Sequence, residues 1–135
     1  LCISEKKYKK TITVKSTSNF LRDFSKYIIE KNPKIKTIGI TGTNGKTTTK
    51  EMVNSIIKQK FRTHCTKGNY NNQIGLPLTI MEMNSKTEYL ILEMGTNSLG
   101  EIEILADIAR PQISTITNIG KGHTEKLKNK KTIFK

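Results

Sequence analysis

Residues 37–52 read "TIGITGTNGKTTTKEM". A β-branched, apolar stretch over 35–41 runs into a turn that contains Gly42 and Gly45, and a helical pattern begins at Lys46. A strand that turns through glycine into a helix presents free backbone N–H groups at the positive end of the helix dipole, where anions bind. Glycine also lets the backbone approach a phosphate with no Cβ in the way. The stretch therefore predicts a phosphate-binding loop.

The side chains after the turn fit a nucleotide with its metal. Lys46 supplies a mobile positive charge, which makes it the candidate catalytic residue, and the Thr47 hydroxyl is placed for Mg²⁺. The spacing G-x-x-G-K-T is shorter than the usual G-x-x-x-x-G-K-[ST], because Ile40 stands five positions before Gly45. An ordinary tight turn that contains glycine and lysine is the alternative. We expect ATP and Mg²⁺ as cofactors, bound by Gly42, Thr43, Asn44, Gly45, Lys46, Thr47 and Thr48.

Strands and helices alternate along the rest of the chain. Periodicity predicts strands over 35–41, 61–66, 88–94 and 112–118, and helices over 19–31, 46–60, 76–83 and 100–109. Ser18 is the expected cap of the first helix. The expected buried faces are Phe20, Leu21, Phe24, Tyr27 and Ile28 on the first helix, and Met52, Val53, Ile56 and Ile57 on the second. This alternation predicts the α/β class, with a parallel sheet, flanking helices and a P-loop-type nucleotide-binding domain.

Composition restricts the class of protein further. The chain of 135 residues is long enough for one domain with a real core. It has no apolar run of membrane-spanning length and no signal peptide, so a soluble, cytoplasmic protein with reduced cysteines is expected. The net charge of +13 comes from scattered lysines without interleaved aromatic residues, which favours a solvated surface over a nucleic-acid groove. A stand-alone nucleotide- or nucleic-acid-binding module with a basic surface remains the alternative.

Four motifs in order resemble the Mur ligase family. They are "TGTNGKTTT" (41–49), "GNYNNQIGLPLT" (68–79), "LEMGTNSLGEI" (92–102) and "NIGKGHTE" (118–125). The resemblance covers about 19–135 and implies the N-terminal part of a central ATP-binding domain, truncated at its C-terminal end. Residues 1–18 would then be a linker or the tail of a preceding domain. The chain lacks an initiator Met and stops inside a helical pattern, so we expect a fragment of a longer protein.

The resemblance also implies a reaction. These ligases serve peptidoglycan precursor synthesis, and the motifs are most similar to the member that joins D-alanyl-D-alanine to UDP-N-acetylmuramoyl-tripeptide. ATP would phosphorylate the tripeptide carboxylate, and the amine of the dipeptide would attack the resulting acyl phosphate. The parent protein would be the enzyme, and the fragment would supply the ATP and Mg²⁺ site without ligating alone.

Three further polar residues are candidates from their positions. Glu93 lies at the carboxyl end of the predicted strand 88–94, at the sheet edge where α/β proteins bind ligands, and a carboxylate there suits Mg²⁺ together with Thr47. The resemblance implies the same metal role, against the alternative of a solvent-exposed glutamate. Asn71 and Asn72 are candidate substrate-binding residues that would position the acceptor carboxylate or the γ-phosphate. Ordinary turn chemistry is their alternative.

His123 is the last candidate. A lone loop histidine is usually a surface residue, but the resemblance implies that it helps hold a second metal ion, although Thr124 stands where the family has an apolar residue. In an ungapped alignment, the lysine that this family carbamylates falls two positions beyond Lys135, and Lys130 or Lys131 would replace it only in a shortened loop. We therefore expect residues 121–135 to be the least ordered part of the chain, with no second metal at His123.

Overall fold

The computed structural model describes residues 2–120 and has the α/β architecture that the sequence predicts. Its elements in chain order are β1 (Cys2–Ser4), β2 (Thr11–Thr13), α1 (Thr17–Lys31), β3 (Lys36–Thr41), α2 (Lys46–Ile57), β4 (Thr63–Cys65), α3 (Gly75–Met81), β5 (Tyr89–Glu93), α4 (Glu101–Ala109) and β6 (Ile113–Ile116). All eight helices and strands expected after residue 18 are present, with shifted ends. The predictions for residues 121–135, including those on His123, Lys130 and Lys131, lie outside the described residues.

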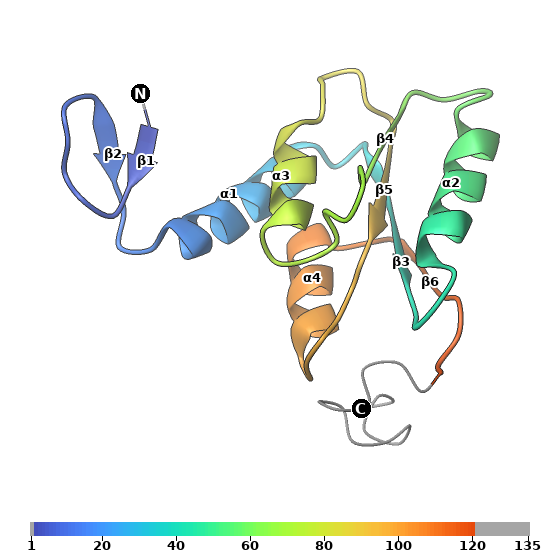
Figure 1. The fold of residues 1–135 in the computed structure, drawn as a ribbon. Helices are drawn as coiled ribbons and strands as arrows, with labels where there is room; N and C mark the ends of the chain where they lie inside the picture. Colours follow the sequence, from blue (N-terminus) through green and yellow to red (C-terminus); the bar gives the residue numbers. More distant parts are fainter. Residues whose placement is uncertain (1, 121–135) are drawn as a thin grey trace.

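The main sheet has four parallel strands in the order β4-β5-β3-β6. The chain moves from β3 to β4 on one side, returns to β5, and then crosses β3 to reach β6. Helix α2 covers one face of the sheet, and α1, α3 and α4 cover the other (Figure 1). Because β3 and β5 are adjacent and parallel, the phosphate loop after β3 and Glu93 at the end of β5 lie at the same edge of the sheet.

Both faces of β5 are buried. Leu90 and Leu92 pack with α3 and α4, while Ile91 packs with Ile38 and Ile40 of β3 on the face that α2 covers. This alternation explains the near-continuous apolar run over 88–94, which is typical of a central parallel strand. The strand that ends in Glu93 is thus held rigidly on both sides.

The N-terminal residues contain structure that the sequence does not predict. Strands β1 and β2 form a separate two-stranded parallel sheet, beyond the start of α1 in Figure 1. The expected cap Ser18 is wrong: Ser16, in an extended conformation, accepts the N–H of Asn19, and α1 begins at Thr17. The Glu5 carboxylate also accepts hydrogen bonds from the N–H and the hydroxyl of Thr17.

Two helical faces differ from the expected ones. On α1, Tyr27 is 53 % exposed, while Ser25 is buried and donates its hydroxyl to the carbonyl of Pro77 on α3. A small residue at this contact lets the two helices approach closely. Phe20, Phe24 and Tyr27 form a stack of rings in which Phe24 and Tyr27 are exposed.

On α2, Met52 and Ile56 are 60 % and 69 % exposed, and the other two residues of the predicted stripe, Val53 and Ile57, are partly buried. Val53 and Ile57 pack against the sheet, and Lys50 is buried on the same face. Since the hydrogen bonds of Lys50 let it occupy an inward position, the helix is rotated away from the face that apolar periodicity alone indicates.

Candidate functional site

The phosphate loop connects β3 to α2 and depends on two glycines with positive φ. Gly42 has a φ of 136°, and a Cβ there would collide with the Thr117 hydroxyl and meet the backbone of Asn118 at 3.0 Å. Gly45 has a φ of 78° and stands at the N-cap of α2, with open space around it. Glycine is needed at both positions for conformation, and at Gly42 also for space.

Residues 117–120, which follow β6, form hydrogen bonds with the phosphate loop. The N–H groups of Thr43 and Asn44 donate to the backbone and side-chain oxygens of Asn118, both at 3.0 Å. The Thr117 hydroxyl donates to the Asn44 carbonyl at 2.6 Å, and Gly120 N–H donates to Thr43 Oγ1 at 2.9 Å. The amides of residues 43 and 44 are therefore engaged, and the amides in the first turn of α2, including those of Thr47 and Thr48, are the ones without an intrahelical acceptor.

Lys46 folds back over the loop. Its ammonium donates to the carbonyls of Gly42 at 2.8 Å and Thr43 at 3.2 Å, and the side chain is partly buried. This places one positive charge beside the glycine turn, and phosphate binding by Lys46 stays a prediction.

Glu93 is the centre of a hydrogen-bonded cluster beside the loop. The residue is 2 % exposed, and its carboxylate accepts the Thr47 hydroxyl on Oε2 and the Asn71 amide on Oε1, both at 2.8 Å. Its own N–H donates to the Thr66 hydroxyl at 3.0 Å. The alternative of a solvent-exposed strand-end glutamate is wrong, because the carboxylate is buried and each of its oxygens accepts one hydrogen bond.

The chemistry of this cluster fits Mg²⁺. The ion takes one or two carboxylates together with phosphate oxygens and water, and here a carboxylate and a hydroxyl lie within hydrogen-bond distance of each other beside a phosphate-type loop. Among residues 2–120, no three His, Cys, Asp or Glu side chains gather into a set that could hold a metal ion by themselves. The Glu93 carboxylate and the Thr47 hydroxyl therefore suit a cation that binds together with the nucleotide, rather than a structural metal held by protein ligands alone.

The two asparagines have different contacts. Asn71 holds Glu93, and its carbonyl accepts the N–H of Gly95 at 2.7 Å. The Asn72 side-chain oxygen accepts the N–H groups of Ile74 and Gly75 and so joins the loop to α3. Asn72 thus performs the turn chemistry that the sequence left open, and Asn71 contacts a candidate metal ligand.

A cavity of about 240 Å³ opens next to this cluster. Its lining residues are Lys46, Asn71, Asn72, Gln73, Gly95, Thr96, Asn97, Glu101 and Leu105. Sequence reasoning singled out the motif over 92–102 but assigned no role to Thr96, Asn97 or Glu101. The sequence contains a signal for this structure, because polar residues followed by a glutamate at the start of a helix indicate helix capping. Glu101 accepts the N–H groups of Asn97 at 2.6 Å and Ser98 at 3.1 Å, which shapes one wall of the cavity.

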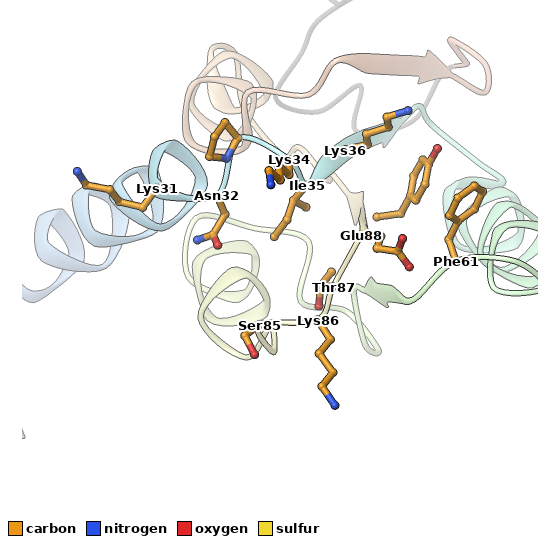
Figure 2. Close-up of a pocket in the computed structure, with 12 residues that line it drawn as sticks. Lys31, Asn32, Lys34, Ile35, Lys36, Phe61, Ser85, Lys86, Thr87 and Glu88 are labelled. Atoms are coloured by element: carbon orange, nitrogen blue, oxygen red, sulfur yellow. The ribbon is translucent and has the colours of Figure 1, made fainter.

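A larger cavity of about 600 Å³ lies at the opposite edge of the sheet, where β3 and β5 begin. Figure 2 shows that the ammonium groups of Lys31 and Lys86 point away from it, and that Glu88 faces Phe61. The Glu88 carboxylate accepts the N–H of Arg62 at 2.9 Å. This cavity lacks the convergent groups of the phosphate-loop edge, so the smaller cavity is the candidate site.

Comparison with known proteins points to one family. A family model, the Mur ligase middle domain, matches residues 40–135. The UDP-N-acetylmuramoyl-tripeptide–D-alanyl-D-alanine ligase of Bacillus subtilis is 43 % identical over 123 residues, which are 90 % of this chain and 26 % of that protein. The ligase of the same name from Borreliella burgdorferi is 43 % identical over 120 residues, 87 % of this chain and 26 % of its own length. The chain thus spans about a quarter of the length of these curated relatives.

Solved structures are similar over nearly the whole chain. A crystal structure of MurF from Acinetobacter baumannii superposes with a TM-score of 0.92 at 33 % identity, covering 98 % of this chain and 30 % of that one. The MurF ligase of Thermotoga maritima, solved in complex with ADP, superposes with a TM-score of 0.88 at 32 % identity, covering 98 % and 31 %. Within residues 2–120, no helix is long and apolar enough to cross a membrane.

Proposed function

The chain belongs to the Mur ligase family through its middle domain, and from this premise we propose that it carries the ATP site of a cytoplasmic ligase of peptidoglycan precursor synthesis. The full-length ligase joins D-alanyl-D-alanine to UDP-N-acetylmuramoyl-tripeptide, as the names of its relatives indicate for those proteins. Residues 19–135 would form the N-terminal part of the central domain, and residues 1–18 would be a linker or the tail of a preceding domain. The remaining substrate contacts belong to the part of the ligase outside this chain.

The observation that carries the proposal is the cluster of Thr47, Glu93 and Asn71 beside Lys46. A buried carboxylate, a helix-start hydroxyl and a lysine above a glycine turn converge at the carboxyl edge of a parallel sheet. This is the edge where α/β sheets bind ligands. The relative solved with ADP supports ATP as the nucleotide.

Each group has a role in the first chemical step. The amides at the start of α2 and the Lys46 ammonium bind the phosphates and neutralise the charge that develops as the γ-phosphoryl group moves to the tripeptide carboxylate. Thr47 and Glu93 would hold Mg²⁺, which would supply additional charge neutralisation when bound. Asn71 orients Glu93, and the cavity beside Lys46 receives the acceptor carboxylate next to Asn72. In the full-length ligase, but not in this chain alone, we also propose His123 as a ligand of a second metal ion.

Nucleotide binding by the full-length ligase tests this proposal. Binding of ATP that requires Mg²⁺ and is lost in Lys46→Ala, together with phosphate release that needs both the tripeptide and the dipeptide, is the expected result. Affinity for oligonucleotides that falls steeply with salt and ignores Lys46 would instead support a nucleic-acid-binding module. Phosphate release with neither substrate present would contradict the ligase reaction.

A further inference from the structure

Lys50 is a buried lysine to which the proposed ATP site assigns no role. It lies on α2 three residues after Thr47, and its side chain is 2 % exposed. The ammonium donates to the carbonyl of Thr66 at 2.6 Å and pairs with the Glu51 carboxylate at 2.8 Å. A buried ammonium is costly to desolvate, and an apolar side chain of similar volume often packs there with equal or better stability. The contact with Thr66 is therefore informative.

Thr66 lies where β4 stops pairing with β5. Its N–H donates to the carbonyl of Ile91 at 3.0 Å, which continues the parallel register of β4. In a parallel ladder the next bond would run from the N–H of Glu93 to the carbonyl of Thr66. Here the N–H of Glu93 donates to the Thr66 hydroxyl, and the carbonyl accepts from Lys50.

These two hydrogen bonds of Thr66 connect α2, the end of β5 and the loop that carries Asn71. Glu93 is held through its N–H by Thr66, and through its carboxylate by Thr47 and Asn71. The hydrogen bond from Lys50 links Thr66 to α2. Lys50 and Thr47 lie on the same face of this helix, because they are three residues apart. The loop that begins after Thr66 carries Asn71 back to the same carboxylate.

We propose that Lys50 is a positioning residue for the Mg²⁺–ATP site. Its ammonium turns the Thr66 carbonyl toward α2, which leaves the Thr66 hydroxyl to hold Glu93 and directs the loop of Asn71 toward the carboxylate. Lys50 contacts neither nucleotide nor metal and acts through Thr66. This inference rests on the proposed function of the same site.

Two substitutions in the full-length ligase test the proposal. Lys50→Met keeps the length of the side chain and removes the donor, whereas Lys50→Arg keeps a donor. Mutation of a residue that orients a metal ligand typically lowers metal affinity or activity by 10–100-fold. We therefore expect Lys50→Met to raise the Mg²⁺ concentration needed for ADP binding about tenfold. Lys50→Arg should restore most of the loss. Lys58→Met, an exposed lysine at the end of the same helix, is the matched control and should change nothing.

A second measurement needs neither metal nor nucleotide. In the ligand-free ligase, amide hydrogen exchange over residues 66–74 should be faster in Lys50→Met than in the wild type, while exchange over β3 stays the same. Ile108→Ala opens a cavity in the core on the other face of the sheet and serves as the stability control. It should lower the melting temperature without shifting the Mg²⁺ requirement.

The outcomes separate this inference from the proposed function. If Lys50→Met lowers the melting temperature as Ile108→Ala does, with unchanged Mg²⁺ dependence and unchanged exchange over 66–74, Lys50 is only structural. If Lys50→Met does not fold, Thr66→Val removes the hydroxyl that holds Glu93 and must give the same Mg²⁺ shift, and an unchanged titration overturns the proposal. If the wild-type ligase binds no ADP at any Mg²⁺ concentration, the proposed function and this inference fail together.

Discussion

Thr47 and Glu93, 46 residues apart in the sequence, are joined by one hydrogen bond of 2.8 Å from the threonine hydroxyl to Oε2. Thr47 lies in the first turn of α2, and Glu93 is the last residue of β5. The bond therefore links the phosphate loop to the central strand of the sheet. Two oxygens that are already this close need little rearrangement to share one divalent cation.

Glu93→Gln tests the charge at this contact. Glutamine keeps the shape, because its oxygen can accept from Asn71 and its amide can donate to the Thr47 hydroxyl, which rotates to accept. It removes the negative charge that a hard cation needs. We expect the Mg²⁺ requirement of the full-length ligase to rise at least tenfold, with little change in melting temperature. An unchanged Mg²⁺ titration would leave Glu93 as a structural residue.

Lys46→Ala tests the phosphate loop. The ammonium lies over the loop on two carbonyls, and its removal takes away the charge closest to the expected phosphates. Loss of one such contact in a closed site costs on the order of 3 kcal/mol, or ~100-fold in turnover. The fold should persist, because Lys46 is outside both core clusters. Steady-state turnover and circular dichroism measure the two effects, with Lys58→Ala as the exposed control on the same helix.

Cys65 provides a pH-dependent test of the environment near Lys50. Burial raises the pKa of the Cys65 thiol, and the nearby positive charge of Lys50 partly opposes this. At a given pH near neutrality, the folded protein therefore contains less Cys65 thiolate, which is the reactive form, than the unfolded chain does. Alkylation of Cys65, read by mass spectrometry of the peptide that contains it, should be slower in the folded ligase than in urea and should keep rising with pH above the ordinary thiol range. Lys50→Met should slow it further, because the opposing charge is gone.

The sequence was sufficient for the sheet, for the strand–turn–helix at Lys46 and for the position of Glu93, because each is encoded by neighbouring residues. A β-branched run, two glycines and a lysine at a helix start define a strand–turn–helix wherever they occur. A carboxylate at the end of an apolar run lies at the carboxyl edge of a parallel sheet by topology alone.

Lys50 could not be predicted in the same way. A lysine in a helical pattern indicates a solvent-facing position, and its burial depends on a carbonyl 16 residues later in the chain. Lys50, Val53 and Ile57 face the sheet, and Met52 and Ile56 are exposed. The hydrogen bond from Asn71 to Glu93 likewise joins residues 22 apart, and the loop composition indicates turn chemistry equally well.

Gly95→Ala tests whether the Asn71 amide orients Glu93. A Cβ on Gly95 would lie 2.9 Å from Asn71 Cγ, and its three nearest atoms all belong to the Asn71 side chain. The backbone of Gly95 lies outside the left-handed region, so alanine meets a steric obstacle there rather than conformational strain. The substitution should displace the Asn71 amide from Glu93. It should lower kcat/KM of the full-length ligase by about tenfold, which is the size of effect expected when a metal ligand loses a hydrogen-bond partner.

A double-mutant cycle makes this prediction specific. In Asn71→Ala the atoms that oppose the Cβ are absent, so adding Gly95→Ala to that background should cost less than about twofold, a strongly non-additive result for two residues in contact. Asn71→Ala alone should lower kcat/KM about as much as Gly95→Ala alone, because both remove the same hydrogen bond to Glu93 Oε1. Equal costs of Gly95→Ala in both backgrounds would mean that the methyl group disturbs the cavity wall directly. In that case the Asn71 amide would not be the group through which Gly95 acts, and its role in orienting Glu93 would lose this support.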